Sequence, residues 1–376
     1  MRRLRVLPAC VTGTILSIIL LTIPILKLLS VHDSHTQRAG YSQANIWQIA
    51  AAYYLNKDAK RLPGWAEVTL NCKYICDKRS LGICVPLELA IFIYRDDVLT
   101  ESHTYDRSYP VVRVPVAAIS SGPSPVDVLP SSVTLDRCFL PEHFPDVSMI
   151  PRKRRCAVVG NGGILANSGC GSEIDAHDFV VRANIPPLSG YRRDVGSLAH
   201  LSAFNTVTLV NLHRGLIGGG KNTPRGLLSR YQQYFQSLDE TTLWYLKTLR
   251  DPYDKMFREV TQYLRQKANG TKIHFAYSWD PIHIEEMWDL EATGTLGFDM
   301  FAVARTFCDN ITLYGFYPFR EDSTGRKIPH HYFEDITFDY KSKMHNFLLE
   351  HRRLKELETR GELRLVTAKC EPKTHE

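Results

Sequence analysis

The chain has 376 residues, of which 44% are hydrophobic and 23% are charged, and its formal net charge is +6. These values are typical of a globular protein and leave room for one large domain or two small ones. The sequence has no internal repeat and no low-complexity tract, which sets aside fibrous and disordered classes. The basic run at 152–155 is interpreted as a solvated face, with anionic sugars as the alternative, and we expect no nucleic-acid partner.

The N-terminal segment predicts a membrane anchor. Three arginines among the first five residues precede an apolar stretch over 7–29, in which Lys27 is the only charged residue. About 20 apolar residues suffice to cross a bilayer as a helix, and basic residues keep their own side cytosolic. We therefore expect a cytosolic tail over 1–6, a signal-anchor helix over 7–29 and a lumenal remainder, in type II topology. A cleaved signal peptide is the alternative, although the stretch is long for one.

Cysteine usage agrees with an oxidising, lumenal compartment. Nine cysteines, less the one in the anchor, leave eight in the lumenal part, and this even number indicates disulfides. A zinc site built on Cys72, Cys76 and Cys84 is the alternative, but that cluster lacks a fourth ligand. Acceptor sequons begin at Asn269 and Asn310, which predicts N-glycosylation at both.

Residues 30–135 are expected to form a lumenal stem. The first part, to about residue 60, is polar, which predicts a tether. Residues 85–94 and 111–116 are strand-like and predict a small β-rich accessory element. Prolines recur through 122–151, which predicts a connector. The remaining residues, 136–376, are assigned to a catalytic domain.

From Cys156 on, strand, turn and helix patterns alternate. The expected elements are a strand over 156–160, a turn over 161–163, a helix near 171–174, a strand over 179–182, largely helical structure over 224–267, a helix over 298–307 and a strand over 311–316. This alternation predicts an α/β fold with a parallel sheet. Ligands of such sheets bind beyond the carboxyl ends of the strands.

Two of these strands end in glycine turns, at 160–163 and at Gly315. Glycine lets the backbone approach a phosphate or ribose closely, and the N-terminus of a following helix favours an anion. The full G-x-G-x-x-G spacing is absent. By themselves, therefore, the glycines fit a plain structural turn as well as a nucleotide site.

Four motifs in a fixed order carry a resemblance to a known family. The segment from Cys156 to Gly196 strongly resembles the large sialyl motif of the animal sialyltransferases, and the α-2,8-sialyltransferase branch is nearest. Residues 295–319 are similar to the small sialyl motif, 331–334 to the third motif, and His-x4-Glu over 345–350 to the last. Together the motifs cover roughly residues 156–370.

The resemblance implies a modified Rossmann-like glycosyltransferase domain, a GT-A variant with a central, mainly parallel sheet. It implies CMP-sialic acid as the donor substrate, with no cofactor and no metal ion. The sequence agrees with the last point, because it contains no Asp-x-Asp, the pair with which metal-dependent nucleotide-sugar transferases commonly hold their cation. CMP carries one phosphate, whose charge backbone N–H groups and a helix dipole can offset.

By motif position, the resemblance implies a donor site formed by Asn161, Asn184, Thr295, Gly297, Tyr317, His330 and His331. The asparagines offer both donor and acceptor groups to a nucleotide, although Asn161 could instead serve a left-handed turn. Thr295 and Gly297 are expected on the cytidine side, where the pair 293–294 is a competing register, and the two histidines near the phosphate. Tyr317 could equally be a core residue.

His345 is the candidate general base by its place in the last motif. A glycan hydroxyl is a poor nucleophile, and an imidazole with the reference pKa of about 6.5 is suited to take its proton. Direct displacement of CMP would invert the anomeric centre of the sialic acid. Glu350 is expected to orient its surroundings or to cap a helix.

The family's disulfide pattern would pair Cys156 with Cys308 and Cys170 with Cys370, tying the two sialyl motifs together and anchoring the C-terminal tail. The four other lumenal cysteines would pair among themselves, and the sequence leaves their partners open. They are Cys72, Cys76, Cys84 and Cys138.

Several positions depart from the family's pattern. Ala183 replaces a cysteine, Thr206 a proline, Leu296 a threonine and Tyr317 a tryptophan. The first leaves Asn184 in place, whereas the others touch expected donor and acceptor contacts and leave substrate choice open.

The function expected from the resemblance is α-2,8-type transfer of one or a few sialic acids to a sialylated glycolipid or N-/O-glycan. This would occur at the Golgi membrane, in ganglioside biosynthesis or protein glycosylation. A sialyltransferase of α-2,3 or α-2,6 linkage is one alternative. A catalytically inactive lumenal glycan-binding or regulatory homologue is another. The oligomeric state stays open, with a homodimer among the alternatives.

Overall fold

The computed structural model describes residues 65–77, 83–94, 111–115, 132–140, 147–218, 226–246, 253–267, 272–278, 284–337, 342 and 344–370. The predicted anchor over 7–29, the tether and Asn269 lie outside this set. Within it, no helix is both long and apolar enough to cross a bilayer. The chain divides into two units, of which the second, Val68–Val111 with Pro130–Glu376, holds everything that follows unless stated.

A nine-stranded sheet forms the centre of this unit. The first seven strands in spatial order pair in parallel, and the last two join the edge in antiparallel orientation. The spatial order is β13 (Arg364–Val366), β12 (Cys308–Tyr314), β7 (Lys153–Val159), β8 (Phe179–Ala183), β9 (Leu201–Phe204), β10 (Glu240–Tyr245), β11 (Lys272–Ser278), β3 (Ile91–Tyr94) and β6 (Val147–Ser148). The predicted α/β fold with a mainly parallel sheet is confirmed.

Burial along the strands explains why these segments pair in parallel. Every residue of β8 and β9 is buried, as expected for strands that are covered on both faces. β7 is partly exposed over Lys153–Arg155 and buried from Cys156 on. The apolar carboxyl half of β7 therefore lies in the core and delivers its following turn to the edge of the sheet.

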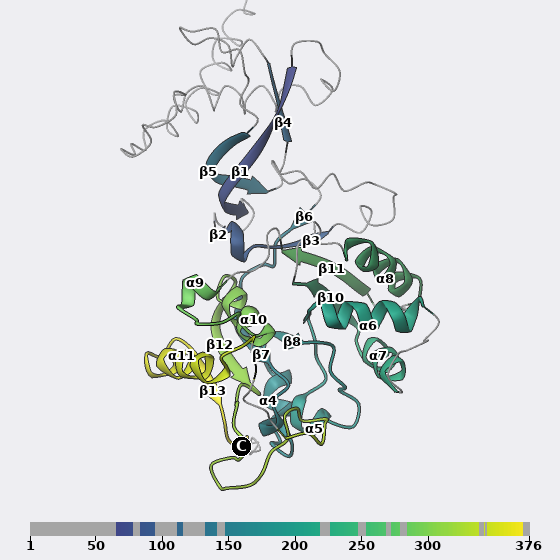
Figure 1. The fold of residues 1–376 in the computed structure, drawn as a ribbon, viewed down its shortest axis with the longest axis vertical. Coiled ribbons are helices and arrows are strands. Elements are labelled where there is room, and N and C mark those ends of the chain that lie inside the picture. Colours follow the sequence, from purple (N-terminus) through teal and green to yellow (C-terminus); the bar gives the residue numbers. More distant parts are fainter. Residues whose placement is uncertain are drawn as a thin grey trace, which may run out of the picture. The chain divides into compact units, whose positions relative to one another are not determined.

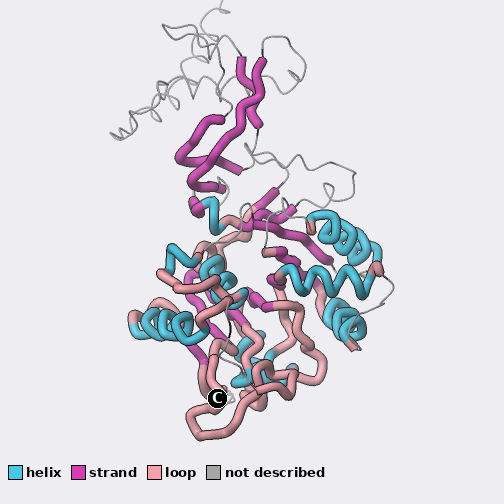
Figure 2. Tube along the Cα trace, viewed as in Figure 1, coloured by secondary structure: helices cyan, strands magenta, loops and turns pink. Residues whose placement is uncertain are grey.

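Helices cover the sheet at several points (Figure 1). α10 is largely buried and packs on β7, β8 and β9, α8 packs on β11, and α11 contacts β13. The helices are α4 (Gly171–Asp175), α5 (Arg192–Val195), α6 (Thr206–Leu216), α7 (Leu227–Gln236), α8 (Asp254–Lys267), α9 (Glu285–Trp288), α10 (Leu296–Ala304) and α11 (Phe347–Thr359), with short 3₁₀ turns η1 (Leu87–Leu89) and η2 (Gly163–Leu165). The connection from β12 to α11 is mostly loop (Figure 2).

Several predicted elements are confirmed, and one prediction is wrong in part. The strands at 156–160 and 179–182, the helix near 171–174, the helix at 298–307 and the strand at 311–316 appear with bounds shifted by a few residues. Residues 224–267 contain the helices α7 and α8, but the prediction missed the strand β10 that separates them. Two β-forming threonines and the aromatic pair Trp244 and Tyr245, which is fully buried, favour this strand.

A second, smaller sheet begins in the segment assigned to the stem and runs past residue 135 in its last strand. β1 (Trp65–Asp77) pairs antiparallel with β2 (Ile83–Pro86) and parallel with β5 (Ser132–Leu140). The connector predicted over 122–151 is therefore wrong over β5, whose residues contain no proline. The strand-like stretches at 85–94 and 111–116 overlap β2, β3 and β4 (Val111–Pro115), and β4 belongs to the first unit from Val112 on.

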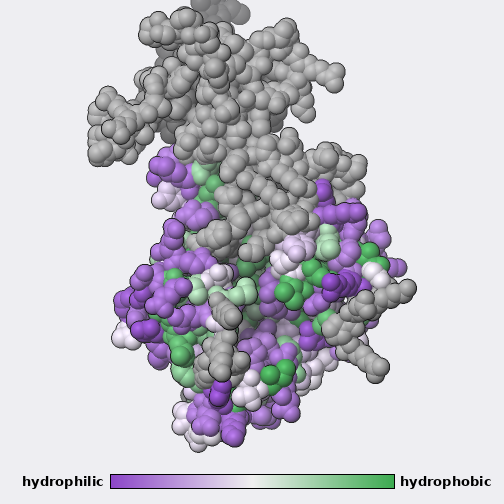
Figure 3. Space-filling view, in the orientation of Figure 1, coloured by the Kyte–Doolittle hydropathy of each residue, from purple (hydrophilic) through white to green (hydrophobic). Residues whose placement is uncertain are grey.

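β3 belongs to the segment assigned to the stem, yet it pairs with β11 of the main sheet. The position of the boundary between stem and catalytic domain stays a prediction. On the face of the described residues seen in Figure 3, hydrophilic residues dominate and hydrophobic residues form small separate patches.

Four disulfides link the described cysteines. The bonds Cys156–Cys308 and Cys170–Cys370 are those that the family resemblance implied. The pairing that the sequence left open is Cys72–Cys138 and Cys76–Cys84. The zinc alternative for the N-terminal cysteines is therefore wrong, because their sulfurs bond to one another.

His200 predicts a loss of stability in acid. The Nδ1 atom of its ring accepts the backbone N–H of Val180 at 2.9 Å, so the ring is neutral in the fold. Burial lowers the pKa of His200, and the nearby Lys153 lowers it further. A lowered folded-state pKa contributes stability that is present above the unfolded pKa of about 6.5 and is lost as the pH falls through it.

We therefore expect the melting temperature of the wild-type chain to fall between pH 7.5 and pH 5. The variant His200→Asn keeps an acceptor oxygen near the Nδ1 position and does not titrate, so its melting temperature should fall less over this range. Thermal unfolding followed by circular dichroism measures both slopes. Equal slopes for the two chains would contradict the assignment of this acid sensitivity to His200.

Candidate functional site

The strand order places a topological switch point between β7 and β12. From β7 the chain builds the sheet outward through β8, β9, β10 and β11, whereas β12 and β13 are added on the other side of β7. Ligands of open α/β sheets bind at the carboxyl ends of the strands at such a point. The two glycine turns of the sequence follow these two strands.

These two glycine turns contact each other directly. The N–H of Gly162 donates to the carbonyl of Gly315 at 3.1 Å, and Gly315 has a φ of +77°. A Cβ atom on Gly162 would lie 2.4 Å from that carbonyl oxygen. The glycines are therefore required for the strand ends to pack, and they leave bare backbone at the switch point.

The third motif packs on the same turn. The N–H of Gly163 donates to the carbonyl of His330 at 3.2 Å, and the N–H of Tyr332 donates to the carbonyl of Asn161 at 3.0 Å. A Cβ atom on Gly163 would lie 1.9 Å from the carbonyl oxygen of Pro329. This close backbone packing holds His330 and His331 beside the first glycine turn.

The two histidine rings lie with their centroids 4.0 Å apart. Burial lowers the pKa of His330, and the neighbouring His331 lowers it further. The Nδ1 of His331 donates to the Glu334 carboxylate at 2.6 Å, and its ring stacks on Phe333. This bond fixes the ring orientation and turns Nε2 of His331 away from Glu334.

Asn161 has one amide atom that the protein leaves unsatisfied. Its Nδ2 donates to the carbonyl of Ala183 at 3.1 Å, whereas its Oδ1 is buried and accepts no hydrogen bond from the described residues. An unsatisfied buried acceptor costs about 1–3 kcal/mol. Its backbone is not in the left-handed region, so the alternative of a left-handed turn at Asn161 is wrong. The geometry fits an oxygen that accepts from a bound ligand.

Asn184 follows β8 and is held in one orientation. Its φ of +59° lies in the left-handed region, which asparagine tolerates better than most residues. Its Oδ1 accepts from the hydroxyl of Thr208 at 2.9 Å and from the N–H of Asn205 at 3.4 Å. Because the oxygen is occupied, the amide nitrogen is the end left to donate to a ligand.

The small motif begins α10 and is tied to the last motif by Glu350. Thr295 caps the helix, its hydroxyl accepting from the N–H of Phe298 at 3.2 Å. The Glu350 carboxylate accepts from the N–H and the hydroxyl of Thr295 at 2.8 and 2.7 Å. Burial raises the pKa of Glu350. Gly297 lies two residues after Thr295, where a Cβ atom would be 3.1 Å from the ring of Phe316.

His345 is oriented by a backbone carbonyl from the same region. Its Nδ1 lies 2.7 Å from the carbonyl oxygen of Thr293, which can only accept a hydrogen bond. The proton of a neutral ring is therefore on Nδ1, and the lone pair is on Nε2. Thr293 therefore bonds His345, and Thr295 bonds Glu350. The two alignments of the small motif considered from the sequence, at 293–294 and at 295–297, thus both fall at this site.

Tyr317 is held by the chain itself. Its hydroxyl donates to the carbonyl of Glu321 at 3.1 Å, and its ring packs against Phe319 and His351. Its predicted contact with the donor stays a prediction.

A sequence profile of glycosyltransferase family 29 (sialyltransferase) matches residues 139–362. The chain belongs to this sialyltransferase family. All four motifs described above lie within the matched residues, which span most of the main sheet.

Two curated relatives are α-N-acetylneuraminide α-2,8-sialyltransferases of frogs. The Xenopus tropicalis protein is 32% identical over 212 residues, which cover 54% of this chain and 58% of the relative. The Xenopus laevis protein is 32% identical over 213 residues, covering 54% and 56%. The chain therefore spans somewhat more than half the length of these curated relatives.

Two similar solved structures are crystal structures of a mammalian sialyltransferase. One is 23% identical with a TM-score of 0.38, and it covers 57% of this chain and 70% of the solved one. The other, in complex with Gal-β-1,3-GalNAc-ortho-nitrophenol, is 22% identical with a TM-score of 0.36 and the same coverage.

The fold brings the sialyltransferase motifs together in two directly bonded groups. One joins Asn161 to the segment of His330 and His331, and the other joins Thr295 to the last motif through Glu350. Glu334 was not predicted as a site residue. Its position three residues after His331 is the sequence signal that could have indicated their contact.

Among the described residues, no three His, Cys, Asp or Glu side chains gather in a group that could hold a metal ion.

Asn161 yields a prediction for donor binding. Replacing Asn161 with alanine removes the unsatisfied Oδ1, and we expect the affinity for CMP to fall about tenfold, a change of about 1.4 kcal/mol. Isothermal titration calorimetry with CMP measures this change. The matched control is Asn211→Ala, which removes an asparagine of α6 that lies outside the four motifs. CMP affinity equal to wild type in Asn161→Ala would show that Oδ1 does not face the nucleotide.

Proposed function

We propose that this chain transfers sialic acid from CMP-sialic acid to a sialylated glycan by α-2,8-type, inverting displacement. The observation that carries the proposal is the bond from Nδ1 of His345 to the carbonyl of Thr293, which leaves the lone pair of Nε2 available next to the small sialyl motif. A general base must present a lone pair to the hydroxyl that it deprotonates, and this tautomer does so.

The donor would bind at the switch point between β7 and β12. Asn161 Oδ1 and the amide nitrogen of Asn184 would hold the nucleotide, and the N-terminus of α10 at Thr295 would favour its negative charge. His330 and His331 would lie at the phosphate. These residues come from separate motifs, and their contacts support a single site.

The reaction would then be a direct displacement. Nε2 of His345 takes the proton of the acceptor hydroxyl while its oxygen forms the new bond to the anomeric carbon of sialic acid. The bond from that carbon to the CMP oxygen breaks, and CMP leaves with the bonding electrons. Attack on the face opposite CMP inverts the anomeric centre. Fixing the base in one tautomer and orientation lowers the entropic cost of this step.

We propose that the transfer needs no metal ion and no cofactor. The sequence has no Asp-x-Asp pair, and the single phosphate of CMP can be met by histidines and backbone N–H groups. We also propose a Golgi membrane protein of type II topology, which rests on the apolar stretch over 7–29, the preceding arginines and the lumenal disulfides.

The acceptor class is proposed from the relatives and from the sequence. The curated relatives are named for transfer to α-N-acetylneuraminide, which supports a sialylated acceptor. The basic segment before the large motif is limited to the run at 152–155, which supports addition of one or a few sialic acids. Leu296 and Tyr317 depart from the family's pattern, so the preference of this chain among glycolipid and glycoprotein acceptors would differ from that of its relatives.

A transfer assay with chelator tests the metal-free mechanism. The full chain in detergent is incubated with CMP-sialic acid and sialylated glycolipids or glycoproteins, with and without EDTA, and free CMP and sialylated product are quantified. We expect the rate with EDTA to equal the rate without it. A loss of most of the activity in EDTA that added magnesium or manganese restores would overturn this part of the proposal.

A further inference from the structure

A polar recess of about 500 Å³ lies away from the candidate donor site. It is lined by residues near the amino ends of three neighbouring strands and by the end of α4, whereas the donor site lies at the carboxyl ends. The lining residues are Arg154, Arg155, Glu173, Ala176, His177, Asn310, Thr312 and Arg364. None of them has a role in the proposed sialyl transfer.

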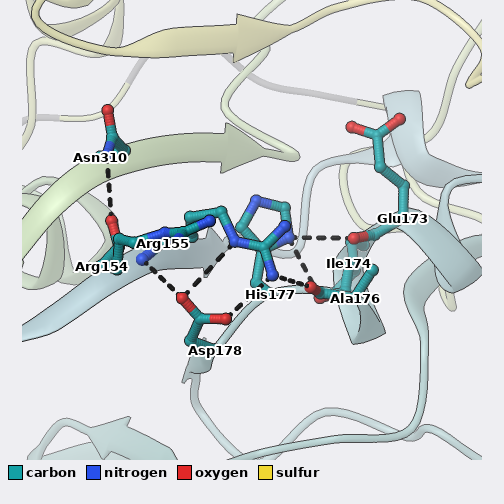
Figure 4. Close-up of polar contacts among 8 residues, drawn as sticks. All are labelled: Arg154, Arg155, Glu173, Ile174, Ala176, His177, Asp178 and Asn310. Atoms are coloured by element: carbon teal, nitrogen blue, oxygen red, sulfur yellow. Dashed lines mark hydrogen bonds and ion pairs between the residues drawn. The ribbon is translucent and has the colours of Figure 1, made fainter.

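Two ion pairs connect residues in and beside the walls of this recess. Nη2 of Arg155 donates to the Asp178 carboxylate at 2.9 Å and to the carbonyl of Ala176 at 3.0 Å (Figure 4). Nη1 of Arg364 lies 2.7 Å from the Glu173 carboxylate. Burial opposes ionisation of Glu173, but hydrogen bonds from Tyr314 and Arg364 hold its pKa below the usual range. Both carboxylates are therefore charged and hold their guanidinium partners in place.

The recess offers both hydrogen-bond donors and hydrogen-bond acceptors. The positive and negative charges of its side chains and their ion-pair partners nearly balance. Nδ1 of His177 donates to the carbonyl of Glu173 at 2.9 Å, so Nε2 of the neutral ring is an acceptor. Arg154 adds hydrogen-bond donors, and its charge also helps to lower the pKa of Asp178, while the hydroxyl of Thr312 can donate or accept. The carboxylate of Glu173 would repel a phosphate. This mixture suits the hydroxyl and acetamido groups of a neutral sugar better than an anion.

The glycosylation sequon that begins at Asn310 lies in the lining of this recess and has no role in the proposed transfer reaction. Asn310 and Thr312 are two residues apart on β12, so their side chains share a face, and both line the recess. Asn310 is exposed, and its Nδ2 donates to the carbonyl of Arg154 at 3.1 Å (Figure 4). N-glycosylation replaces one hydrogen of this amide and keeps the other, so the bond to Arg154 can persist and orient the sugar.

We propose that Asn310 carries an N-glycan whose first sugars are seated in this recess. The volume lies within the range of about 300–1,000 Å³ of small-ligand pockets, which is enough for the N-acetylglucosamine residues at the base of a glycan. The fold supplies their hydrogen-bonding partners through His177, Thr312 and Arg154. The inference needs a lumenal location for this segment and is independent of whether the chain transfers sialic acid.

The test measures how well the folded protein shields the glycan from peptide N-glycosidase F. This enzyme cleaves the bond between asparagine and the first sugar, so it needs access to the segment that the recess would cover. The full chain, expressed in secretory-pathway cells and purified in detergent, is first analysed by glycopeptide mass spectrometry for occupancy at Asn310. Release from Asn310 is then timed for the native and for the denatured chain.

We expect Asn310 to be occupied and its glycan to be released at least tenfold more slowly from the native chain. The variants Arg154→Ala and His177→Ala keep the sequon and should release it faster than wild type, while Arg214→Ala, at an exposed arginine outside the recess, should not. Melting curves confirm that each variant is folded. An empty Asn310, equal release from native and denatured chains, or unchanged protection in both lining variants would overturn the proposal.

Discussion

Replacing His345 with alanine is expected to lower the rate of sialyl transfer by about 10²–10⁴-fold while CMP binding stays near wild type. The side chain bonds the carbonyl of Thr293 through Nδ1, so its other nitrogen is the one that meets the acceptor hydroxyl. The hydrogen bonds and ring contact of His345 are with Ser342, Thr293 and Phe347, whereas nucleotide binding would rest on Asn161 and Asn184. Initial rates of transfer and calorimetry with CMP measure the two quantities.

A histidine far from the motifs is the matched control. His274 lies on β11 and pairs with Glu240 at 3.2 Å, so His274→Ala should retain transfer near the wild-type rate. If His345→Ala transferred sialic acid at nearly the wild-type rate, the assignment of His345 as the base would be wrong. Loss of both transfer and CMP binding would instead indicate a damaged donor site.

Replacing both Cys156 and Cys308 with serine is expected to destabilise the chain by about 2–5 kcal/mol. This disulfide joins the middle of β7 to the first residue of β12, Cys156 is fully buried, and the two cysteines are 152 residues apart in the sequence. Without this disulfide the unfolded chain is no longer closed into a long loop, so its conformational entropy rises. The two serines also place polar hydroxyls where the sulfurs were. Denaturant unfolding of the oxidised wild type and of the double variant measures the difference.

The bond between Cys76 and Cys84 provides the control, because its cysteines are only 8 residues apart. On loop-closure entropy alone, removing this short link should cost about 2–3 kcal/mol less than removing the long one. A double serine variant at Cys76 and Cys84 that lost as much stability as the Cys156 and Cys308 variant would contradict this account of the long disulfide.

The parallel core of the fold could be predicted where the local pattern was strong. β7 and β8 are short apolar runs next to turn signals, and the glycine at the end of β12 marked the second strand of the switch point. β9 has only four residues, and β10 lies between two helices, so neither stood out from its surroundings. Their places in the sheet depend on pairing with distant strands, which periodicity does not record.

The candidate site shows the same division between local and distant information. The motifs identified the side chains, and the bond between His331 and Glu334 is local enough to infer from their spacing. The tautomer of His345 depends on a carbonyl 52 residues away, and the link from Glu350 to Thr295 spans 55 residues. The unsatisfied Oδ1 of Asn161 is visible only once the surrounding chain has folded.

The linkage of the product tests the central claim most directly. The full chain in detergent is incubated with CMP-sialic acid and a panel of sialylated and asialo glycolipids and glycoproteins, and the products are identified by mass and linkage analysis. We predict α-2,8-linked sialic acid on sialylated acceptors alone. Transfer to asialo galactosides in α-2,3 or α-2,6 linkage, or no transfer by a folded chain that binds CMP, would contradict it.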